Sequence, residues 1–475
     1  MVGILAGRFL KAFEPIARFL PEVRPPERKV GLNEKLIWTA LALVIYLIMG
    51  EIPLYGIGRG GVDPFMYLRV IFASRRGTLL ELGIGPIVTA GLILQLLAGA
   101  RMIECDFSNP EDRGLFTTAN KTFSLIFVGV QALAYIIGGA YGALDLRSSV
   151  IIFSELFVAG MILILLDELI QKGWGIGSGI SLFIVAGVAQ NLFWEIFAPL
   201  PAGDGKLYGF IPALAQTLMN GDPIISIILR AGNLPSLIGL IATVAVFMIV
   251  IYCQGVRVEI PISAARYRGF RGRYPIRLLY VSNLPVIFAS SFFANIYIWS
   301  QVIWSRFNRD NSNFLLNLLG QFTVDSRGQM IPSGGLVYYV ISPRSLSDVA
   351  AHPLRAAVYA ALMLSFCAVF SITWLQVGGL DPGTVAKQLV DAGMQIPGYR
   401  RSRRPIQSLL QRYIPPVAVL GGIIVGLIAA MSDFFGVYGT GTGILLSVSI
   451  LYQYYEALMR EQISEMYPAL RSLLR

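Results

Sequence analysis

Gly175-Ile-Gly177-Ser-Gly179-Ile180 follows an apolar run that ends at Asp167, and it opens a further apolar run. The same arrangement returns later in the chain, where Gly439-Thr-Gly441-Thr-Gly443-Ile444 follows a run that ends at Asp433. The two copies lie five apolar runs apart. If every run crosses a membrane, an odd separation makes the copies run in opposite directions, as in an inverted repeat. The pattern therefore predicts two inverted halves with a pathway at the interface between them.

The composition indicates that lipid surrounds these runs. Hydrophobic residues make up 55% of the 475 residues and charged residues only 14%, with a mean hydropathy of +0.66. Soluble domains carry about a quarter charged residues, whereas runs of about 18 or more apolar residues can cross a hydrocarbon core as helices. We predict an all-α membrane protein with ten spans, at Leu36–Ile52, Leu79–Ala98, Thr122–Ala140, Val150–Leu169, Ile176–Phe193, Leu237–Tyr252, Leu284–Trp304, Ala356–Leu375, Ile414–Met431 and Gly441–Tyr455.

Three further features of the chain bear on its organisation. Pro86 in the second span and Pro285 in the seventh fit the same five-span offset as the glycine motifs. The termini and the even-numbered connections hold more than twice as many lysines and arginines as the odd-numbered ones, which predicts that both termini are cytosolic. Residues 1–35 form an N-terminal segment whose composition favours an amphipathic helix, either on the membrane surface or packed on the protein.

Few residues could support catalysis or hold a metal. Cys105, Cys253 and Cys367 lie far apart and form no CxxC pair, so neither a disulfide framework nor a zinc site is indicated. His352 is the only histidine, and no GxxxxGK[ST] phosphate loop occurs. We therefore expect no enzymatic reaction, no cofactor and no metal.

Two connections on the predicted cytosolic side, Arg257 to Arg277 and Gly378 to Arg412, are rich in arginine. Arginines interleaved with tyrosine and phenylalanine suit the phosphates and bases of RNA, and they also suit anionic lipid headgroups. Both interpretations stay open on composition alone. In the second connection, Asp381 followed by Pro382 predicts the start of a short helix, with Gly393 as its stop.

The segment Gly56 to Thr78 contains an apolar helix too short to span a membrane, with glycines before it and Arg75-Arg76-Gly77 after it. It could enter the bundle and withdraw as a movable stopper, or it could be a static re-entrant helix. Only Glu155 among the acidic residues of the spans lies well inside one, which is a poor relay for a secondary transporter. The aliphatic residues Ile180, Ile184 and Leu446 could instead form a constriction that seals by dewetting, or they could be ordinary packing residues.

Several long motifs resemble one family, and the match runs from about Pro26 to Tyr455. They are Arg76-Gly-Thr-Leu-Leu-Glu-Leu-Gly83-Ile84-Gly-Pro86-Ile-Val88-Thr89, Gln95-Leu-Leu-Ala-Gly99, Leu165-Leu-Asp-Glu168, Gly177-Ser-Gly-Ile-Ser181, Ala265-Arg-Tyr-Arg-Gly269, Tyr274-Pro-Ile and Gly441-Thr-Gly-Ile-Leu-Leu446. Together they resemble the SecY family of protein-translocation channels, and within it the alpha subunit of the eukaryotic Sec channel.

This resemblance implies a pore between two five-helix halves, residues 36–230 and 231–460, with a plug in the first half and a cytosolic tail at 461–475. The implied function is to conduct unfolded secretory polypeptides across the endoplasmic reticulum membrane and to release signal sequences and transmembrane segments sideways into lipid. The implied partners are beta and gamma subunits, the ribosome with its rRNA, nascent polypeptides, post-translational translocation partners and membrane lipids. An inverted-repeat secondary transporter is the alternative.

The resemblance also implies four groups of site residues. The pore ring falls on Ile84, Val88, Ile180, Ile184, Val286 and Leu446, and the plug on Val62, Pro64, Phe65, Leu68, Val70 and Ile71. A lateral gate, between spans two and three on one side and seven and eight on the other, carries Thr89, Gln131 and Asn295. The ribosome-binding residues are Arg266, Arg268, Arg271, Arg273, Arg400 and Arg401.

Overall fold

The computed structural model describes most of the chain. The described residues are 13, 15, 20–57, 73–99, 102–103, 105, 110–138, 140–142, 144–202, 204–228, 230, 234–264, 271–281, 283–324, 330–343, 345–395 and 403–466. All six predicted plug residues, and most of the predicted N-terminal amphipathic helix, lie outside these ranges.

The ten predicted spans correspond to ten helices among the described residues. They are α3 (Leu32–Met49), α4 (Gly85–Gly99), α5 (Pro110–Ile137), α6 (Leu146–Leu169), α7 (Gly179–Phe197), α10 (Leu237–Gly255), α11 (Leu284–Phe307), α15 (Pro353–Val377), α17 (Arg403–Phe434) and α18 (Gly441–Met466). Eight of them are long and apolar enough to cross a membrane by length and composition, while α4 is shorter and α18 carries charges in its C-terminal half.

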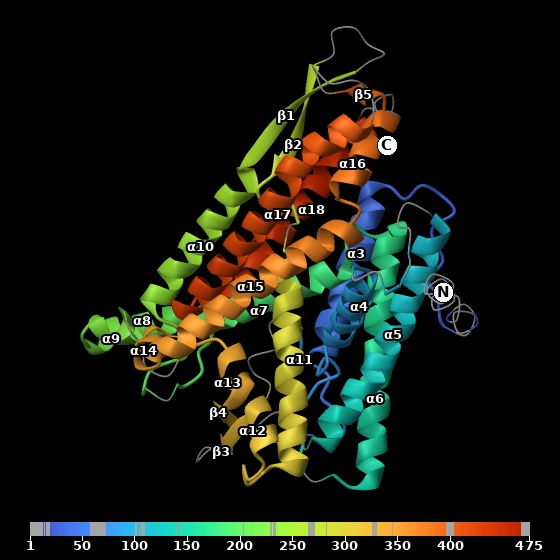
Figure 1. Ribbon diagram of the computed structural model, residues 1–475. Helices are drawn as coiled ribbons and strands as arrows, with labels where there is room; N and C mark the ends of the chain where they lie inside the picture. The colour runs from blue at the N-terminus through green and yellow to red at the C-terminus, as the bar shows by residue number, and fades with distance from the viewer. Residues whose placement is uncertain are drawn as a thin grey trace.

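The connections contain shorter elements, including five strands that the sequence analysis did not predict. These elements are the π-helical turn η1 (Ile170–Trp174), α8 (Phe210–Asn220), α9 (Ile225–Ile228), β1 (Arg257–Ala264), β2 (Arg271–Arg277), α12 (Phe314–Leu319), β3 (Gln321–Val324), β4 (Met330–Gly334), α13 (Gly335–Val340), α14 (Leu346–Ala351), α16 (Pro382–Asp391) and β5 (Met394–Gln395). Figure 1 shows β1, β2 and β5 at one end of the helical bundle and α12 to β4 at the other.

The second span begins later than predicted. Residues 79–84 form turns, and α4 starts only at Gly85. The carboxylate of Glu81 accepts the backbone N–H of Gly77, and the N–H of Glu81 is bonded to the carbonyl of Thr78 at 2.9 Å. These bonds favour a compact turn over an additional helical turn. Pro86 is the second residue of α4 and Pro285 is the second residue of α11, so the two prolines occupy equivalent places in the two halves, where a missing N–H costs nothing.

Each glycine motif starts a helix that is capped by the aspartate before it. Oδ1 of Asp167, in α6, accepts the N–H of Ile180 at 3.0 Å in the first turn of α7. Oδ1 of Asp433, in α17, accepts the N–H of Gly441 at 2.8 Å at the start of α18. A helix start has N–H groups with no partner inside the helix, and in a membrane water cannot supply one. The two aspartates therefore fill the same role in the two halves.

The glycines of the two motifs let each aspartate come close to the helix that it caps. The glycines that are equivalent in the structure are, however, shifted by two residues from those that the sequence match aligns. The match aligns Gly177 with Gly441, whereas the structure pairs Gly177 with Gly439, because both have positive φ, +74° and +67°. It likewise pairs Gly179 with Gly441, because both begin a helix. A Cβ atom on Gly179 would lie 2.7 Å from Cα of Asp167, so only glycine fits between the capping aspartate and the helix it caps.

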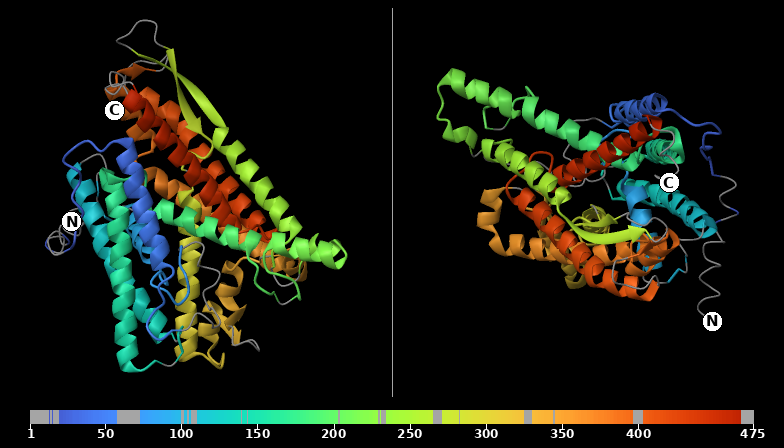
Figure 2. Two further views of the ribbon diagram at one scale, coloured as in Figure 1. Left: turned by 180° about the vertical axis from the view of Figure 1, so that it is seen from behind. Right: turned by 90° about the horizontal axis from the view of Figure 1, so that it is seen from above.

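The α7 and α18 helices pack against each other in opposite directions, which confirms the inverted orientation predicted for the two copies. The Tyr454 hydroxyl, late in α18, donates to the carbonyl of Ser178 at the start of α7, at 2.9 Å. The carboxylate of Glu195, late in α7, accepts the N–H of Gly439 just before α18, at 2.8 Å. Figure 2 shows the pair from behind. This antiparallel pair forms one seam between the two halves.

A second seam joins the halves on the other side of the bundle. There α4 and α5 of the first half contact α11 of the second, and α4 also contacts α15. These are the second, third, seventh and eighth spans, so the predicted gate helices are neighbours. Within the second half, α11 packs on α15 and α17, and edge-to-face aromatic pairs such as Phe288–Phe370 and Phe293–Phe366 hold α11 to α15. The gate helix α11 is thus firmly attached to its own half.

We predict that Asp433→Ala lowers the free energy of unfolding by about 1 kcal/mol, the loss seen when a helix cap is removed. The N–H of Gly441 would lose its acceptor, and the Tyr359 hydroxyl, which donates to Oδ2 of Asp433 at 3.2 Å, would lose one as well. Thermal unfolding of the purified protein in detergent measures the effect. Asp310→Ala removes an exposed carboxylate at the far end of α11 and serves as the control. Equal stability of the two variants would contradict the capping role.

Candidate functional site

The residues of the predicted pore ring lie together in the largest cluster of buried apolar side chains. Five of them are less than a tenth exposed, and Ile180 is half-buried against the same cluster. Ile184 and Leu446 are each the sixth residue of their helix, α7 and α18. The capped helix starts therefore place these two side chains at equivalent positions in the two halves. The ring contains no polar side chain that could bind an ion or a particular solute.

Two of the three predicted gate residues form a hydrogen bond across the second seam. Nδ2 of Asn295, in α11, donates to Oγ1 of Thr89, in α4, at 3.0 Å. The same amide nitrogen donates to the carbonyl of Ser291 at 2.8 Å, and Oγ1 of Thr89 donates to the carbonyl of Gly85 at 2.8 Å. The hydroxyl of Thr89 thus donates within its own helix and accepts from the opposite half. This is a direct polar contact between the halves at the predicted gate.

The third predicted gate residue, Gln131, is not part of this hydrogen bond. It is buried in α5, and its Nε2 atom has no hydrogen-bond partner within the part of the chain that the structure describes. A buried amide without a partner costs about 1–3 kcal/mol. Gln131 therefore destabilises this arrangement of the helices, whereas the bond between Thr89 and Asn295 stabilises the arrangement.

The ionisable groups near the spans are tied to fixed partners. Glu155 accepts the backbone N–H of Tyr55 at 2.9 Å. Glu168 pairs with Lys121 at 2.7 Å and with Lys172 at 2.8 Å, and Lys172 also bonds to Glu22, which lowers the pKa of that exposed carboxyl group. The contacts of Glu168 and Lys172 lie where α6 passes into η1, next to the N-terminal segment. They hold that segment in place and do not form a relay through the bundle.

The N-terminal segment packs on the protein where it is described. The ring of Phe13 lies 5.3 Å from that of Phe123 in α5. Lys121 donates to the carbonyl of Pro21 at 2.6 Å, and Nε1 of Trp174 donates to the carbonyl of Arg24 at 2.9 Å. These residues therefore pack on the protein, as in the second alternative of the sequence analysis, but residues 21–26 have no helical structure.

The two arginine-rich connections meet in one small sheet. Strands β1 and β2 form an antiparallel hairpin, and the tip of β1 pairs with β5 through Ser263 with Gln395 and Ala264 with Met394. β5 lies directly before the second arginine run. The sheet projects from the end of the bundle in Figure 1. Segments more than 100 residues apart in sequence thus meet in one sheet.

The predicted ribosome-binding arginines are only partly described. Arg266, Arg268, Arg400 and Arg401 lie outside the described residues, and Arg271 is described only through its backbone, as the first residue of β2. Arg273 has a side chain that is 76% exposed and pairs with Glu259 across the hairpin at 2.6 Å, which lowers the pKa of Glu259. Arg277, at the base, pairs with Glu456 of α18 at 2.6 Å and so anchors the hairpin to the bundle.

The short helix predicted in the second connection is confirmed as α16. The carboxylate of Asp381 accepts the N–H groups of Gly383 and Thr384 at 3.0 and 3.1 Å, and Gly393 follows the helix with φ +75°. Val385 and Leu389 are buried against α17. This packing fixes the direction in which β5 and the arginine run leave the bundle.

Sequence reasoning missed two kinds of functional residue. Glu195 and Tyr454, which join α7 to α18, belong to no motif, and their roles depend on which helices are neighbours. Arg306, just beyond the predicted end of the seventh span, donates from Nε to the carbonyl of Ile137 in α5 at 3.1 Å. An arginine directly after a span was the available signal, although such residues commonly mark only the membrane surface.

Comparison with known proteins agrees with this arrangement. Residues 78–455 match the family model SecY, and residues 44–77 match the model described as the plug domain of Sec61p. The chain belongs to the SecY family. This SecY-family chain is 44% identical to the Sec61 subunit alpha of Dictyostelium discoideum over 96% of its length and 97% of that protein, and 44% identical to SecY of Pyrococcus horikoshii over the same shares.

A solved relative shares the fold of this SecY-family chain. Sec61 in the canine ribosome-channel complex from the endoplasmic reticulum is 38% identical, with a TM-score of 0.79 over 96% of this chain and 98% of that one. The fold is therefore that of a SecY-type channel with a plug domain, which is not an enzyme class, and the secondary-transporter alternative of the sequence analysis is not supported. The relatives are both eukaryotic and archaeal, so membership of the family does not by itself choose between the two.

We predict that Thr89→Val and Asn295→Ala are coupled, because each removes one partner of the same hydrogen bond. Such bonds between membrane helices contribute about 0.6 kcal/mol on average and at most about 1.7 kcal/mol. A double-mutant cycle on thermal unfolding in detergent measures the coupling free energy. The control cycle pairs Thr122→Val with Asn295→Ala, because the Thr122 hydroxyl donates only within α5. A coupling no larger than that of the control cycle would exclude the gate contact.

Proposed function

We propose that this chain is the pore-forming alpha subunit of a protein translocon. It conducts unfolded secretory polypeptides across the membrane and releases signal sequences and transmembrane segments sideways into lipid. The observation that carries the proposal is the arrangement of the two seams around a buried aliphatic cluster. One seam has hydrogen bonds between opposite ends of α7 and α18, and the other includes an amide–hydroxyl bond between α4 and α11.

The aliphatic cluster suits a polypeptide better than a defined solute. Polypeptides present every kind of side chain, so a pore that conducts them cannot rely on fixed ligands. A ring of Ile84, Val88, Ile180, Ile184, Val286 and Leu446 excludes water and ions by dewetting when it is closed, and aliphatic side chains make no strong bond that would hold a passing chain. The plug, whose residues Val62, Pro64, Phe65, Leu68, Val70 and Ile71 lie in the segment that matches a plug domain, would close the same passage.

The gate energies suit regulation by a signal sequence. A bond of about 0.6 kcal/mol between Thr89 and Asn295 shifts the ratio of closed to open gate less than threefold. The unpaired amide of Gln131 acts in the opposite direction, since an open gate would let it find a partner. A hydrophobic segment entering between α4, α5, α11 and α15 therefore needs only modest binding energy to hold the gate open.

The membrane and the partners are also part of the proposal. We place the chain in the endoplasmic reticulum membrane as a eukaryotic alpha subunit, supported by its likeness to Sec61 of Dictyostelium discoideum and to Sec61 of the canine ribosome-channel complex. Both termini are cytosolic, as the charge distribution indicates. The partners are beta and gamma subunits, the ribosome and post-translational translocation partners, which supply the energy because this chain performs no reaction of its own.

Replacing Ile84, Val88, Ile180 and Ile184 together with glycine should make the resting channel leak ions, because a wider and wetter constriction loses its dewetting barrier. Conductance of the purified complex in planar bilayers measures the leak. The control replaces the same four residues with leucine, which keeps the ring apolar and should stay tight. The glycine variant must still pass a signal-bearing precursor into vesicles, and a resting conductance equal to that of the leucine variant would exclude the ring.

Arg273→Gln should weaken ribosome binding and reduce the slope of log affinity against log salt by about 1, because one phosphate contact is lost. Arg257→Gln is the matched control. Arg257 also pairs with Glu259, at 3.1 Å, but it lies at the base of the hairpin beside the bundle. Binding is measured by co-sedimentation with ribosomes across a salt series. Equal slopes for the two variants would mean that the tip of the hairpin does not contact RNA.

A further inference from the structure

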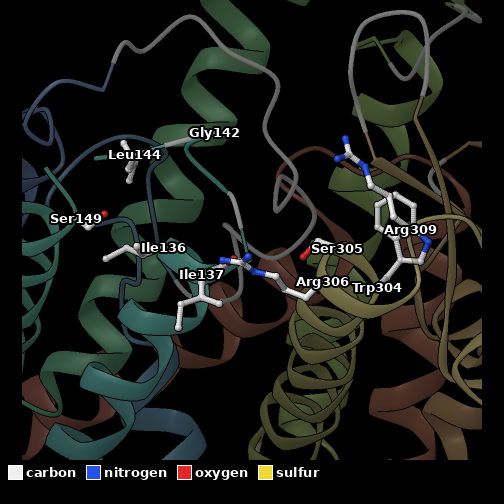
Figure 3. Close-up of a pocket in the computed structure, with 10 residues that line it drawn as sticks. Ile136, Ile137, Gly142, Leu144, Ser149, Trp304, Ser305, Arg306 and Arg309 are labelled. Atoms are coloured by element: carbon white, nitrogen blue, oxygen red, sulfur yellow. The ribbon is translucent and has the colours of Figure 1, made fainter. Parts of the chain in front are cut away.

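A pocket lies between the two halves at the end of the bundle opposite the β1–β2 hairpin. It has a volume of about 570 Å³ and is lined by the C-terminal ends of α5 and α11 together with part of the connection from α5 to α6. The apolar lining includes Ile136, Ile137, Leu144 and Trp304, and the charged lining is Arg306 and Arg309. Figure 3 shows Arg306 reaching across toward Ile137. The pocket thus has walls from both sides of the predicted gate.

One wall of the pocket is fixed by a hydrogen bond. Nε of Arg306 donates to the carbonyl of Ile137, the last residue of α5, at 3.1 Å. A cation at the C-terminal end of a helix is stabilised by the helix dipole. This bond uses one of the five N–H donors of the guanidinium group, so the terminal nitrogens remain available to another acceptor.

The two arginines of the pocket have no acidic partner. Neither Arg306 nor Arg309 pairs with a carboxylate among the residues that the structure describes. Several described arginines near a helix end or loop elsewhere do have one, for example Arg230 with Asp204 and Arg355 with Asp348. The pocket therefore carries two uncompensated positive charges, and both side chains are exposed to whatever fills it.

The position of the pocket favours a membrane lipid as its occupant. Trp304 is the last residue of the predicted seventh span, so Arg306 and Arg309 lie where that span meets the headgroup region. Basic pockets between spanning helices suit anionic headgroups, and a guanidinium group matches the geometry of a phosphate. Nε1 of Trp304 already donates to Asn311 at 2.8 Å, so its ring contributes apolar surface. Charge at one side and apolar side chains at the other match a headgroup and the start of its acyl chains.

We propose that this pocket binds the phosphate-bearing headgroup of an anionic phospholipid. The phosphate oxygens accept from the guanidinium groups of Arg306 and Arg309, and the glycerol region lies against Ile136 and Leu144. Because α5 and α11 both contribute walls, the bound headgroup holds the two halves together at this end of the gate. That last consequence rests on the proposed function, whereas binding itself does not.

The experiment measures phospholipid binding to the purified full-length chain with its partners. Native mass spectrometry in detergent titrates phosphatidylinositol, phosphatidylcholine and inorganic phosphate against four proteins: the unchanged chain, Arg306→Gln, Arg309→Gln and Arg147→Gln. Arg147 is the matched control, because it is an exposed arginine near the start of α6 that does not line the pocket. We expect each pocket variant to weaken phosphatidylinositol binding about fivefold, the contribution of one basic side chain near an anionic surface, and the control to change it less than twofold.

The other outcomes overturn the proposal. An equal loss in Arg147→Gln would mean that general positive charge, and not this pocket, attracts the lipid. Inorganic phosphate binding as tightly as phosphatidylinositol would mean that the site takes a free anion, and unchanged binding in both pocket variants would mean that it takes neither. Arg306→Lys, which keeps the charge, should retain most of the binding, and this separates loss of charge from loss of fold. The assay requires no translocation, so its failure leaves the proposed function standing.

Discussion

The structure depends on which groups accept hydrogen bonds from the N–H groups at the starts of two helices inside a membrane. The N–H groups that begin α7 and α18 cannot reach water, so each requires a protein acceptor. Asp167 and Asp433 supply it from the preceding helix, and glycine at each start lets the aspartate come close enough. Once the starts are fixed, Tyr454 and Glu195 join the two helices to each other in opposite directions. The places of Ile184 and Leu446 in the buried cluster follow from these contacts.

The two seams between the halves are held by different kinds of contact. At the α7–α18 seam, Glu195 accepts the backbone N–H of Gly439, so separation would leave that N–H without its acceptor, while the carbonyl of Ser178 that accepts from Tyr454 also accepts the N–H of Leu182. At the gate seam, the contact between Thr89 and Asn295 joins two side chains that each keep a second bond within their own helix. Separating the gate helices would break this bond and also the bond from Arg306 in α11 to the carbonyl of Ile137 in α5, whereas Thr89 and Asn295 would each keep a bond within their own helix.

The charged residues are distributed in keeping with these roles. Near the spans, Glu155 is bonded to the N–H of Tyr55, and Glu168 is paired with Lys121 and Lys172. Arg277 is used to anchor the β1–β2 hairpin to α18, and this leaves the exposed Arg273 nearer the tip. At the opposite end of the bundle, Arg306 joins the two halves through a backbone carbonyl and, with Arg309, carries charge that no described acidic residue balances.

The sequence by itself determined the spans, the inverted orientation of the two halves and the start of α16, because hydropathy, motif spacing and capping residues are local properties. It also predicted the ring and gate positions, through the long motifs that carry them. It did not determine which glycines of the two motifs are equivalent. Only the backbone shows that Gly439, with its positive φ, corresponds to Gly177, two residues away from the alignment of the sequences. Nor did it determine that β1 pairs with β5, that Gln131 stays outside the gate bond, or that Arg306 reaches Ile137. Those contacts join residues more than 100 positions apart, and only the packing of the helices decides which distant residues become neighbours.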